Sequence, residues 1–249
     1  LFTFMQHPRQ LLDPQAEPFL LTTWRAKMGL LQKMDFPVIV AADFCPELSR
    51  LGYREFVEKF LVGYLGMKHL VAGYDTHLGA DRHGTADTLS ELGQDLGYTV
   101  EVVPPVKEAD QIISSSAIRN ALAAGDCQLA TAMLGRPYAL WGEVTPGDGR
   151  GRTIGYPTAN VSPLNPRKLL PASGVYACRI QVSGDVVPGN DDGTLGLVEE
   201  PLPEVDRHGT MLAPGHGRWR LYGGMLNFGH VPTFHDGGLE LPRIEVNLF

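Results

Sequence analysis

The feature that most constrains the fold of this chain is a change in the spacing of its apolar residues near residue 136. Before that point, short apolar runs alternate with amphipathic segments of helical period, as in 37–44 followed by 53–65. Alternation of this kind is typical of a parallel sheet covered by helices. The first half is therefore predicted to be an α/β domain.

Local signals predict several helices in this half. A threonine precedes the helix predicted over 22–34, and threonine is a favoured N-cap residue. The helix predicted over 85–97 ends at Gly97, a residue that closes helices because it adopts positive φ readily. Two further helices are predicted over 115–125 and 126–135, and short strands over 2–5, 68–73 and 98–103.

After residue 136 the helical period disappears. Apolar runs with strand-like alternation are separated by loops rich in glycine and proline, which is typical of a small antiparallel barrel or sandwich. The predicted strands cover 138–145, 174–182, 218–229 and 243–249. The fold class expected is thus α/β plus all-β, with a first domain over 1–136 and a second over 137–249.

Within the second domain, residues 183–217 are rich in glycine, proline and acids, and are predicted to be a surface insertion. A chain of 249 residues with 43% hydrophobic residues can bury one large core or two modest ones. The sequence starts at Leu1 and stops in a predicted strand, so we expect a longer protein that continues at both ends.

Charge and cysteine content exclude some classes of partner. A net charge of −7 disfavours a general nucleic-acid or anionic-membrane binder, which needs a basic face. No apolar run is long enough to span a bilayer. Three widely spaced cysteines suit a reducing compartment, which indicates the cytoplasm. Self-association is left open by these observations.

The stretch "GRTIGYPTAN", residues 151–160, has two interpretations. Glycine, proline, threonine and asparagine suit a surface turn. The same glycines let backbone N–H groups approach phosphates, and Arg150 or Arg152 adds positive charge. Thr158 and Asn160 offer hard oxygen ligands of the kind that Mg²⁺ prefers beside a nucleotide.

Four motifs in the second half occur in a fixed order: G-x-G-R-x-x-G-Y-P-T-A-N, L-P-x-x-G-V-Y-A, Y-G-G-x-x-N-x-G-x-x-P-T-F and x-E-V-x-L-F. This series resembles the riboflavin kinase domain. The first half resembles the FMN adenylyltransferase domain that precedes it in bifunctional bacterial FAD synthetases. The resemblance implies a nucleotidyltransferase-type parallel α/β domain, incomplete here, followed by a small β-barrel of riboflavin-kinase type that is incomplete at its C-terminus.

For the kinase half, the resemblance implies a role for each matching residue. Glu245 matches the general base for the ribityl 5′-hydroxyl; the alternative is a strand-edge carboxylate facing solvent. Asn227 is interpreted as loop-shaping. ATP, phosphate or metal binding is implied for Gly149, Gly151, Arg152, Thr158 and Asn160, of which Thr158 and Asn160 are the Mg²⁺ ligands.

For the adenylyltransferase half, "ISSSAIR" at 113–119 matches a nucleotide-phosphate motif at a helix start. There Ser115 and Ser116 act as caps and donors, and Arg119 as a planar cation; the alternative is an ordinary serine cap with a solvated arginine. Asp75 and His7 match flavin or nucleotide positions. The H-x-G-H motif of this class is expected upstream of Leu1.

The resemblance implies an enzyme of flavin biosynthesis that phosphorylates riboflavin to FMN and adenylylates FMN to FAD, with ATP as co-substrate and Mg²⁺ as cofactor. Two alternatives remain: a riboflavin kinase with a degenerate first domain, and a non-catalytic flavin- or nucleotide-binding module. An intact Thr158, Asn160 and Glu245 favour catalysis, because binding alone does not require a base.

Overall fold

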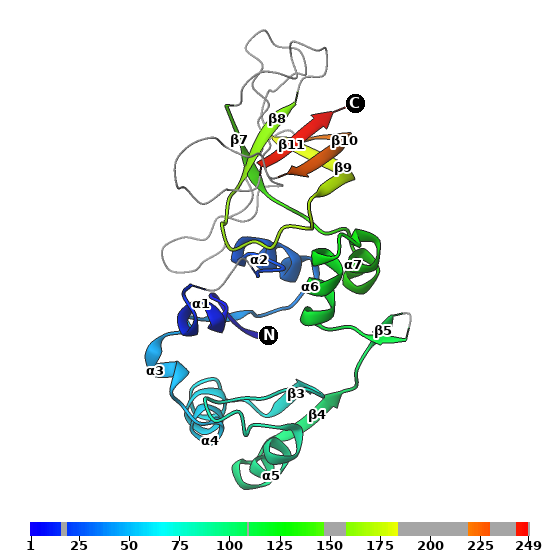
Figure 1. Ribbon diagram of the computed structural model, residues 1–249. Coiled ribbons are helices and arrows are strands. Elements are labelled where there is room, and N and C mark those ends of the chain that lie inside the picture. The colour runs from blue at the N-terminus through cyan, green and yellow to red at the C-terminus, as the bar shows by residue number, and fades with distance from the viewer. Residues whose placement is uncertain (16–18, 109, 147–157, 184–218, 230–242, 249) are drawn as a thin grey trace. The chain divides into compact units, whose positions relative to one another are not determined.

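The computed structural model describes residues 1–15, 19–108, 110–146, 158–183, 219–229 and 243–248 (Figure 1). The chain divides into two compact units. Unit 1 comprises Leu1–Ala16 and Phe36–Ile113, and unit 2 comprises Glu17–Asp35 and Ser114–Phe249. This is a division by packing, and the domain boundary after residue 136 stays a prediction.

Unit 1 contains two parallel strand pairs, as the alternation of strands and helices predicts. Strand β1 (Phe2–Phe4) pairs with β2 (Val40–Ala42), and β3 (His69–Gly73) pairs with β4 (Thr99–Val103). A short antiparallel pair, β5 (Lys107–Glu108) and β6 (Gln111–Ile112), was not predicted. Among the described residues the parallel pairs form separate two-stranded sheets.

Four helices of unit 1 supply residues to one apolar cluster. They are α3 (Pro46–Ser49), α4 (Tyr53–Glu55), the π-helix η1 (Phe56–Tyr64) and α5 (Ala86–Leu96), whereas α1 (Pro8–Leu12) supplies none. The buried members of the cluster are Phe56, Val57, Leu61, Leu89, Leu92 and Tyr98. Helix α5 ends as predicted, with Gly97 at a φ of 72°.

The helix predicted over 53–65 is divided into α4 and η1. Its aromatic residues do share a face, since the ring centroids of Phe56 and Phe60 lie 5.9 Å apart and those of Phe60 and Tyr64 lie 5.7 Å apart. The wider turn brings the Glu58 carbonyl oxygen close to residue 63, where a Cβ would lie only 3.0 Å from it. Glycine at this position avoids that close contact.

Unit 2 contains three helices that the sequence predicts. Helix α2 (Trp24–Lys33) begins after Thr23, whose hydroxyl accepts from the Ala26 N–H at 3.4 Å. Helices α6 (Ser115–Ala123) and α7 (Cys127–Leu134) follow one another directly. The segment before α2 is anchored to residues further along the chain, because the N–H groups of Phe19 and Leu20 donate to the Arg167 carbonyl oxygen.

The rest of unit 2 is an antiparallel sheet of five strands in the order β7-β8-β11-β10-β9 (Figure 1). The strands are β7 (Gly142–Thr145), β8 (Ala159–Pro163), β9 (Gly174–Ser183), β10 (Trp219–Gly229) and β11 (Arg243–Leu248). Among the described residues its edge strands β7 and β9 do not pair, so the sheet is open. The expected closed barrel is therefore not shown, because closure requires the edges to be joined.

Strand β8 corrects one expectation. One interpretation of the Pro-Thr-Ala-Asn stretch is a surface turn, yet Ala159 and Asn160 begin a strand that pairs with β7 on one side and β11 on the other. The long-range pairing overrides the local turn preference of Asn160. The predicted insertion over 183–217 lies almost entirely outside the described residues, which resume at β10.

Candidate functional site

A row of polar residues crosses the sheet of unit 2. Thr145 on β7 is paired with Asn160 on β8, Asn160 with Glu245 on β11, and Glu245 with Asn227 on β10. Side chains of directly opposed residues project from the same face of an antiparallel sheet, with Cβ atoms about 4.5–5.5 Å apart. The register therefore sets Glu245 between two amide side chains.

Burial shows which face carries this row. Ile244 and Val246 flank Glu245 in β11 and are only 1% and 2% exposed. Together with Val161, Ile180 and Phe228 they form the apolar cluster of the sheet. Because successive strand residues point to opposite faces, Glu245 lies on the face away from this cluster, and it is half-buried there. A slip of one residue in β11 would bury the carboxylate in the core.

Thr158 precedes Asn160 by two residues and is exposed. Asn160 offers an amide oxygen directly opposite Glu245, and Thr158 offers a hydroxyl two residues before it; hydroxyl and amide oxygens are donors that fit a hard cation such as Mg²⁺. Gly149, Gly151 and Arg152, predicted to cover phosphates, lie outside the described residues. Within the part of the chain that is described, no three His, Cys, Asp or Glu side chains group as a metal site.

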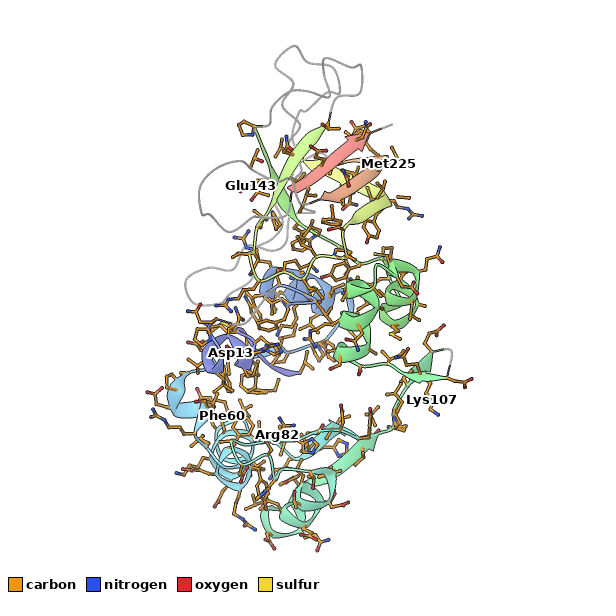
Figure 2. The ribbon with its side chains drawn as sticks, viewed as in Figure 1. Asp13, Phe60, Arg82, Lys107, Glu143 and Met225 are labelled. Carbon is orange, nitrogen blue, oxygen red and sulfur yellow. The ribbon has the colours of Figure 1, made fainter. Side chains whose placement is uncertain are left out.

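Two residues of the row were not recognised from the sequence. Asn227 was interpreted as loop-shaping, but it lies in β10 directly opposite Glu245. Thr145 ends β7 and carried no motif. The alternation of apolar and polar residues in these strands is the sequence signal that could have placed both on the Glu245 face. Figure 2 labels two other side chains of this sheet, Glu143 on β7 and Met225 on β10.

In unit 1, His7 and Asp75 have local structural partners. His7 is the N-cap of α1: its Nδ1 accepts from the Arg9 N–H at 3.1 Å, and its own N–H donates to Gln10 Oε1 at 2.8 Å. Asp75 follows β3, and its carbonyl oxygen lies 2.8 Å from Nδ1 of His77. Both site residues are exposed.

In unit 2, the "ISSSAIR" segment begins α6, but the cap is neither Ser115 nor Ser116. Ser114 holds that position and accepts from the Ala117 N–H at 3.1 Å, because its backbone is extended while the next residues are already helical. Ser115 and Ser116 are exposed. Arg119 is half-buried, and its Nε donates to the Phe19 carbonyl oxygen at 2.9 Å. Arg119 thus anchors the segment that leads into α2.

Lys168 is a further chemically distinctive residue that no motif indicated. Its side chain is buried, its Nζ donates to the Leu21 carbonyl oxygen at 2.6 Å, and it lies 3.8 Å from the centroid of the Tyr138 ring. Burial lowers the pKa of Lys168 to about 7, and the charge of Arg136 acts in the same direction. The carbonyl and the ring favour the ammonium form and oppose this shift.

Each half of the chain matches a known family. Residues 1–117 match the FAD synthetase family, and residues 134–249 match the riboflavin kinase family. In the described residues no helix is long and apolar enough to cross a membrane. The two matches define a chain in which a domain of FAD-synthetase type precedes a domain of riboflavin-kinase type.

Individual relatives agree with this order of domains. A bifunctional riboflavin kinase/FMN adenylyltransferase of Bacillus subtilis is 35% identical over 251 residues, covering 100% of this chain and 67% of the relative. One from Escherichia coli is 35% identical over 207 residues, covering 83% of this chain and 61% of the relative. The chain belongs to the bifunctional riboflavin kinase/FMN adenylyltransferase family.

A solved structure has a similar fold over the whole chain. It is described as a macrolide-efflux protein from Streptococcus pneumoniae, and it superimposes with a TM-score of 0.72 at 30% identity. The match covers 100% of this chain and 68% of that one. It supports the two-domain architecture found by the family matches.

Proposed function

We propose that this chain phosphorylates riboflavin to FMN with its second half and adenylylates FMN to FAD with its first half. The observation that carries the kinase assignment is the register of β8 and β11, which sets Glu245 directly opposite Asn160. A base and a metal-binding amide are thereby adjacent on one face of the sheet. The proposal includes two features of the fold. The second half, from residue 137, forms a closed barrel, and the strands of the first half form one continuous sheet of nucleotidyltransferase type.

In the kinase reaction, the ribityl 5′-hydroxyl oxygen attacks the γ-phosphorus of ATP. The bond from that phosphorus to the ADP oxygen breaks, and Glu245 accepts the hydroxyl proton. Thr158 and Asn160 would hold Mg²⁺, which would supply neutralisation of the phosphate charge. The sheet contributes by fixing the Glu245 carboxylate, since its neighbours Ile244 and Val246 are locked in the core.

In the adenylyltransferase reaction, a phosphate oxygen of FMN attacks the α-phosphorus of ATP and pyrophosphate leaves. Arg119 and the start of α6 stabilise the phosphate charge in this proposal, because charged donors and helix N-termini both favour anions. His7 and Asp75 are assigned to the nucleotide or flavin of the same reaction. The ligands are small molecules, and the compartment we propose is the cytoplasm.

The direct test of the kinase metal site is a Mg²⁺ titration of riboflavin phosphorylation. Thr158→Ala and Asn160→Ala are each expected to raise the half-saturating Mg²⁺ concentration several-fold, because each removes an oxygen ligand from a cation that tolerates few substitutes. Ser162→Ala, on the same strand, is the matched control and should titrate like the wild type. If the half-saturating Mg²⁺ concentration is unchanged in both test variants, the stretch that contains Thr158 and Asn160 has a purely structural role.

A separate prediction concerns Arg119. Arg119→Ala is expected to slow FAD formation from FMN at least tenfold, by removing a charge-assisted contact worth about 1.5–3 kcal/mol. Riboflavin phosphorylation should remain near wild type, because the residues assigned to the kinase reaction all lie in the second half of the chain and Arg119 lies in the first. Product chromatography after incubation with ATP and either flavin measures both rates.

Because Arg119 also contacts the Phe19 carbonyl, its variant needs a structural control. Ser114→Ala removes the α6 cap and costs about 1 kcal/mol of stability without removing the cation. Thermal unfolding of both variants separates the two effects. If both variants lose FAD formation to the same extent, Arg119 acts by maintaining the structure at the start of α6 and not by contacting phosphate.

A further inference from the structure

Lys168 is a buried amine to which neither proposed reaction gives a role. Its side chain is only 7% exposed, and it forms part of the wall of a cavity of about 480 Å³ in unit 2. The same wall includes residues at the start of α2, on β7 and in the segment after β8. A cavity of this volume admits a small molecule to the surroundings of the amine.

The cavity adjoins the row of polar residues that contains Glu245. Glu143, labelled in Figure 2, lines the cavity, and Thr145 of that row lies two residues later in β7. Residues two apart in a strand project from the same face of the sheet. A ligand at Lys168 therefore lies beside the kinase residues, but the group that would bind it is not one of them.

Two contacts fix the position of the Lys168 amine. Nζ donates to the Leu21 carbonyl oxygen at 2.6 Å and lies 3.8 Å from the centroid of the Tyr138 ring. Leu21 lies two residues before Thr23, which lines the cavity. The amine is therefore held near the part of the wall that the start of α2 forms.

The surroundings of Lys168 favour loss of its proton. Burial lowers its pKa to about 7, and the charge of Arg136 acts in the same direction. A lysine that is desolvated or next to another cation is a nucleophile at neutral pH, because a large fraction of it is the uncharged amine. While it donates one proton to the Leu21 carbonyl, the uncharged amine keeps its lone pair for an electrophile.

The charges around the cavity favour an anionic ligand. Arg25 lines the cavity and is exposed, so its guanidinium can turn toward a ligand. Glu143 is the one acidic residue among the described residues that line the cavity, and it is exposed to solvent. A guanidinium pairs with a carboxylate through two parallel hydrogen bonds. A carboxylate on the ligand therefore suits Arg25.

From these features we infer that Lys168 forms an imine with a small aldehyde that carries a carboxylate. The Nζ lone pair attacks the carbonyl carbon, a proton moves from nitrogen to oxygen, and water leaves; uptake of one proton from solvent gives the positively charged iminium. The carboxylate meets Arg25. The iminium keeps one N–H for the Leu21 carbonyl and a positive charge for the Tyr138 ring, so both contacts of Lys168 are retained.

The test is reductive trapping with glyoxylate, a two-carbon aldehyde that carries a carboxylate. The chain is incubated at pH 7 with glyoxylate and sodium cyanoborohydride, which reduces the imine to a stable secondary amine. Mass spectrometry of peptides then gives the modified fraction of each lysine. Lys168 is the only lysine after residue 107, so its peptide is identified without ambiguity. We expect Lys168 to react at least tenfold faster than Lys59, an exposed lysine that is paired with Glu55.

Propanal, an aldehyde without a carboxylate, tests the role of Arg25. With rates normalised to those at Lys59, Lys168 should prefer glyoxylate over propanal by at least threefold. Arg25→Ala should abolish this preference, and Arg54→Ala, which removes an arginine from unit 1, should retain it. Modification of Lys168 no faster than that of Lys59, or a preference that survives in Arg25→Ala, overturns the inference. The readout is covalent modification of one residue, so failure of either proposed activity leaves it unaffected.

Discussion

Replacing Glu245 by glutamine is expected to lower the turnover of riboflavin phosphorylation by about 10²–10⁴-fold, because glutamine keeps the shape of the side chain but cannot accept the hydroxyl proton. The register with Asn160 and Asn227 should be retained, since the buried neighbours Ile244 and Val246 hold the strand. Flavin binding should therefore change little. Initial rates of FMN formation, with flavin affinity measured in parallel, check this expectation.

The matched control is Glu101→Gln, which neutralises an exposed carboxylate in a strand of unit 1. It should phosphorylate riboflavin at the wild-type rate. A Glu245→Gln protein that makes FMN nearly as fast as the control would show that the carboxylate is only part of a solvated sheet face.

The second large effect is a pH dependence of stability caused by Lys168. Burial lowers the pKa of Lys168 in the folded protein from 10.5 to about 7. Between these values the unfolded chain carries a proton on Lys168 that the folded chain lacks, so the free energy of unfolding rises with pH. The destabilisation is fully present below pH 7 and is relieved toward pH 10.5. From pH 7 to 9 the expected gain is about 2–3 kcal/mol.

Lys168→Met removes this contribution and keeps an apolar chain of similar length. Both proteins are unfolded with urea at pH 7 and at pH 9. The free energy of unfolding of the wild type should rise between these pH values relative to that of Lys168→Met. Lys59→Met, which replaces an exposed lysine paired with Glu55, is the control and should retain the wild-type slope. Parallel curves for wild type and Lys168→Met would show that Lys168 keeps its ordinary protonation when buried.

The parts of the fold that were predictable depend on neighbouring residues. Helices α2 and α5 were placed correctly because Thr23 and Gly97 are local signals that act within one turn. The strand β11 was predicted because its apolar residues alternate. Strand β8 was missed because its residues, taken alone, favour a turn, and pairing on both sides makes them a strand.

The site was predictable only in part, for the same physical reason. Resemblance marked Asn160 and Glu245 individually, but their direct opposition follows from pairing between strands distant in sequence. Lys168 had no local signal at all, since its burial depends on Leu21, Tyr138 and the segment before α2. Long-range contacts of this kind cannot be deduced from residue type or spacing.

The position of β11 has a consequence for biosynthesis. It is the last described strand to leave the ribosome, yet it lies between β8 and β10 in the sheet. Until it is synthesised, the β7–β8 and β9–β10 pairs have no hydrogen-bonded connection, and their unpaired edges are open to association with other chains. Glu245 arrives on this same strand. A nascent chain therefore acquires the Glu245 carboxylate and the link between its two strand pairs in the same step, and a product that stops before β11 has neither.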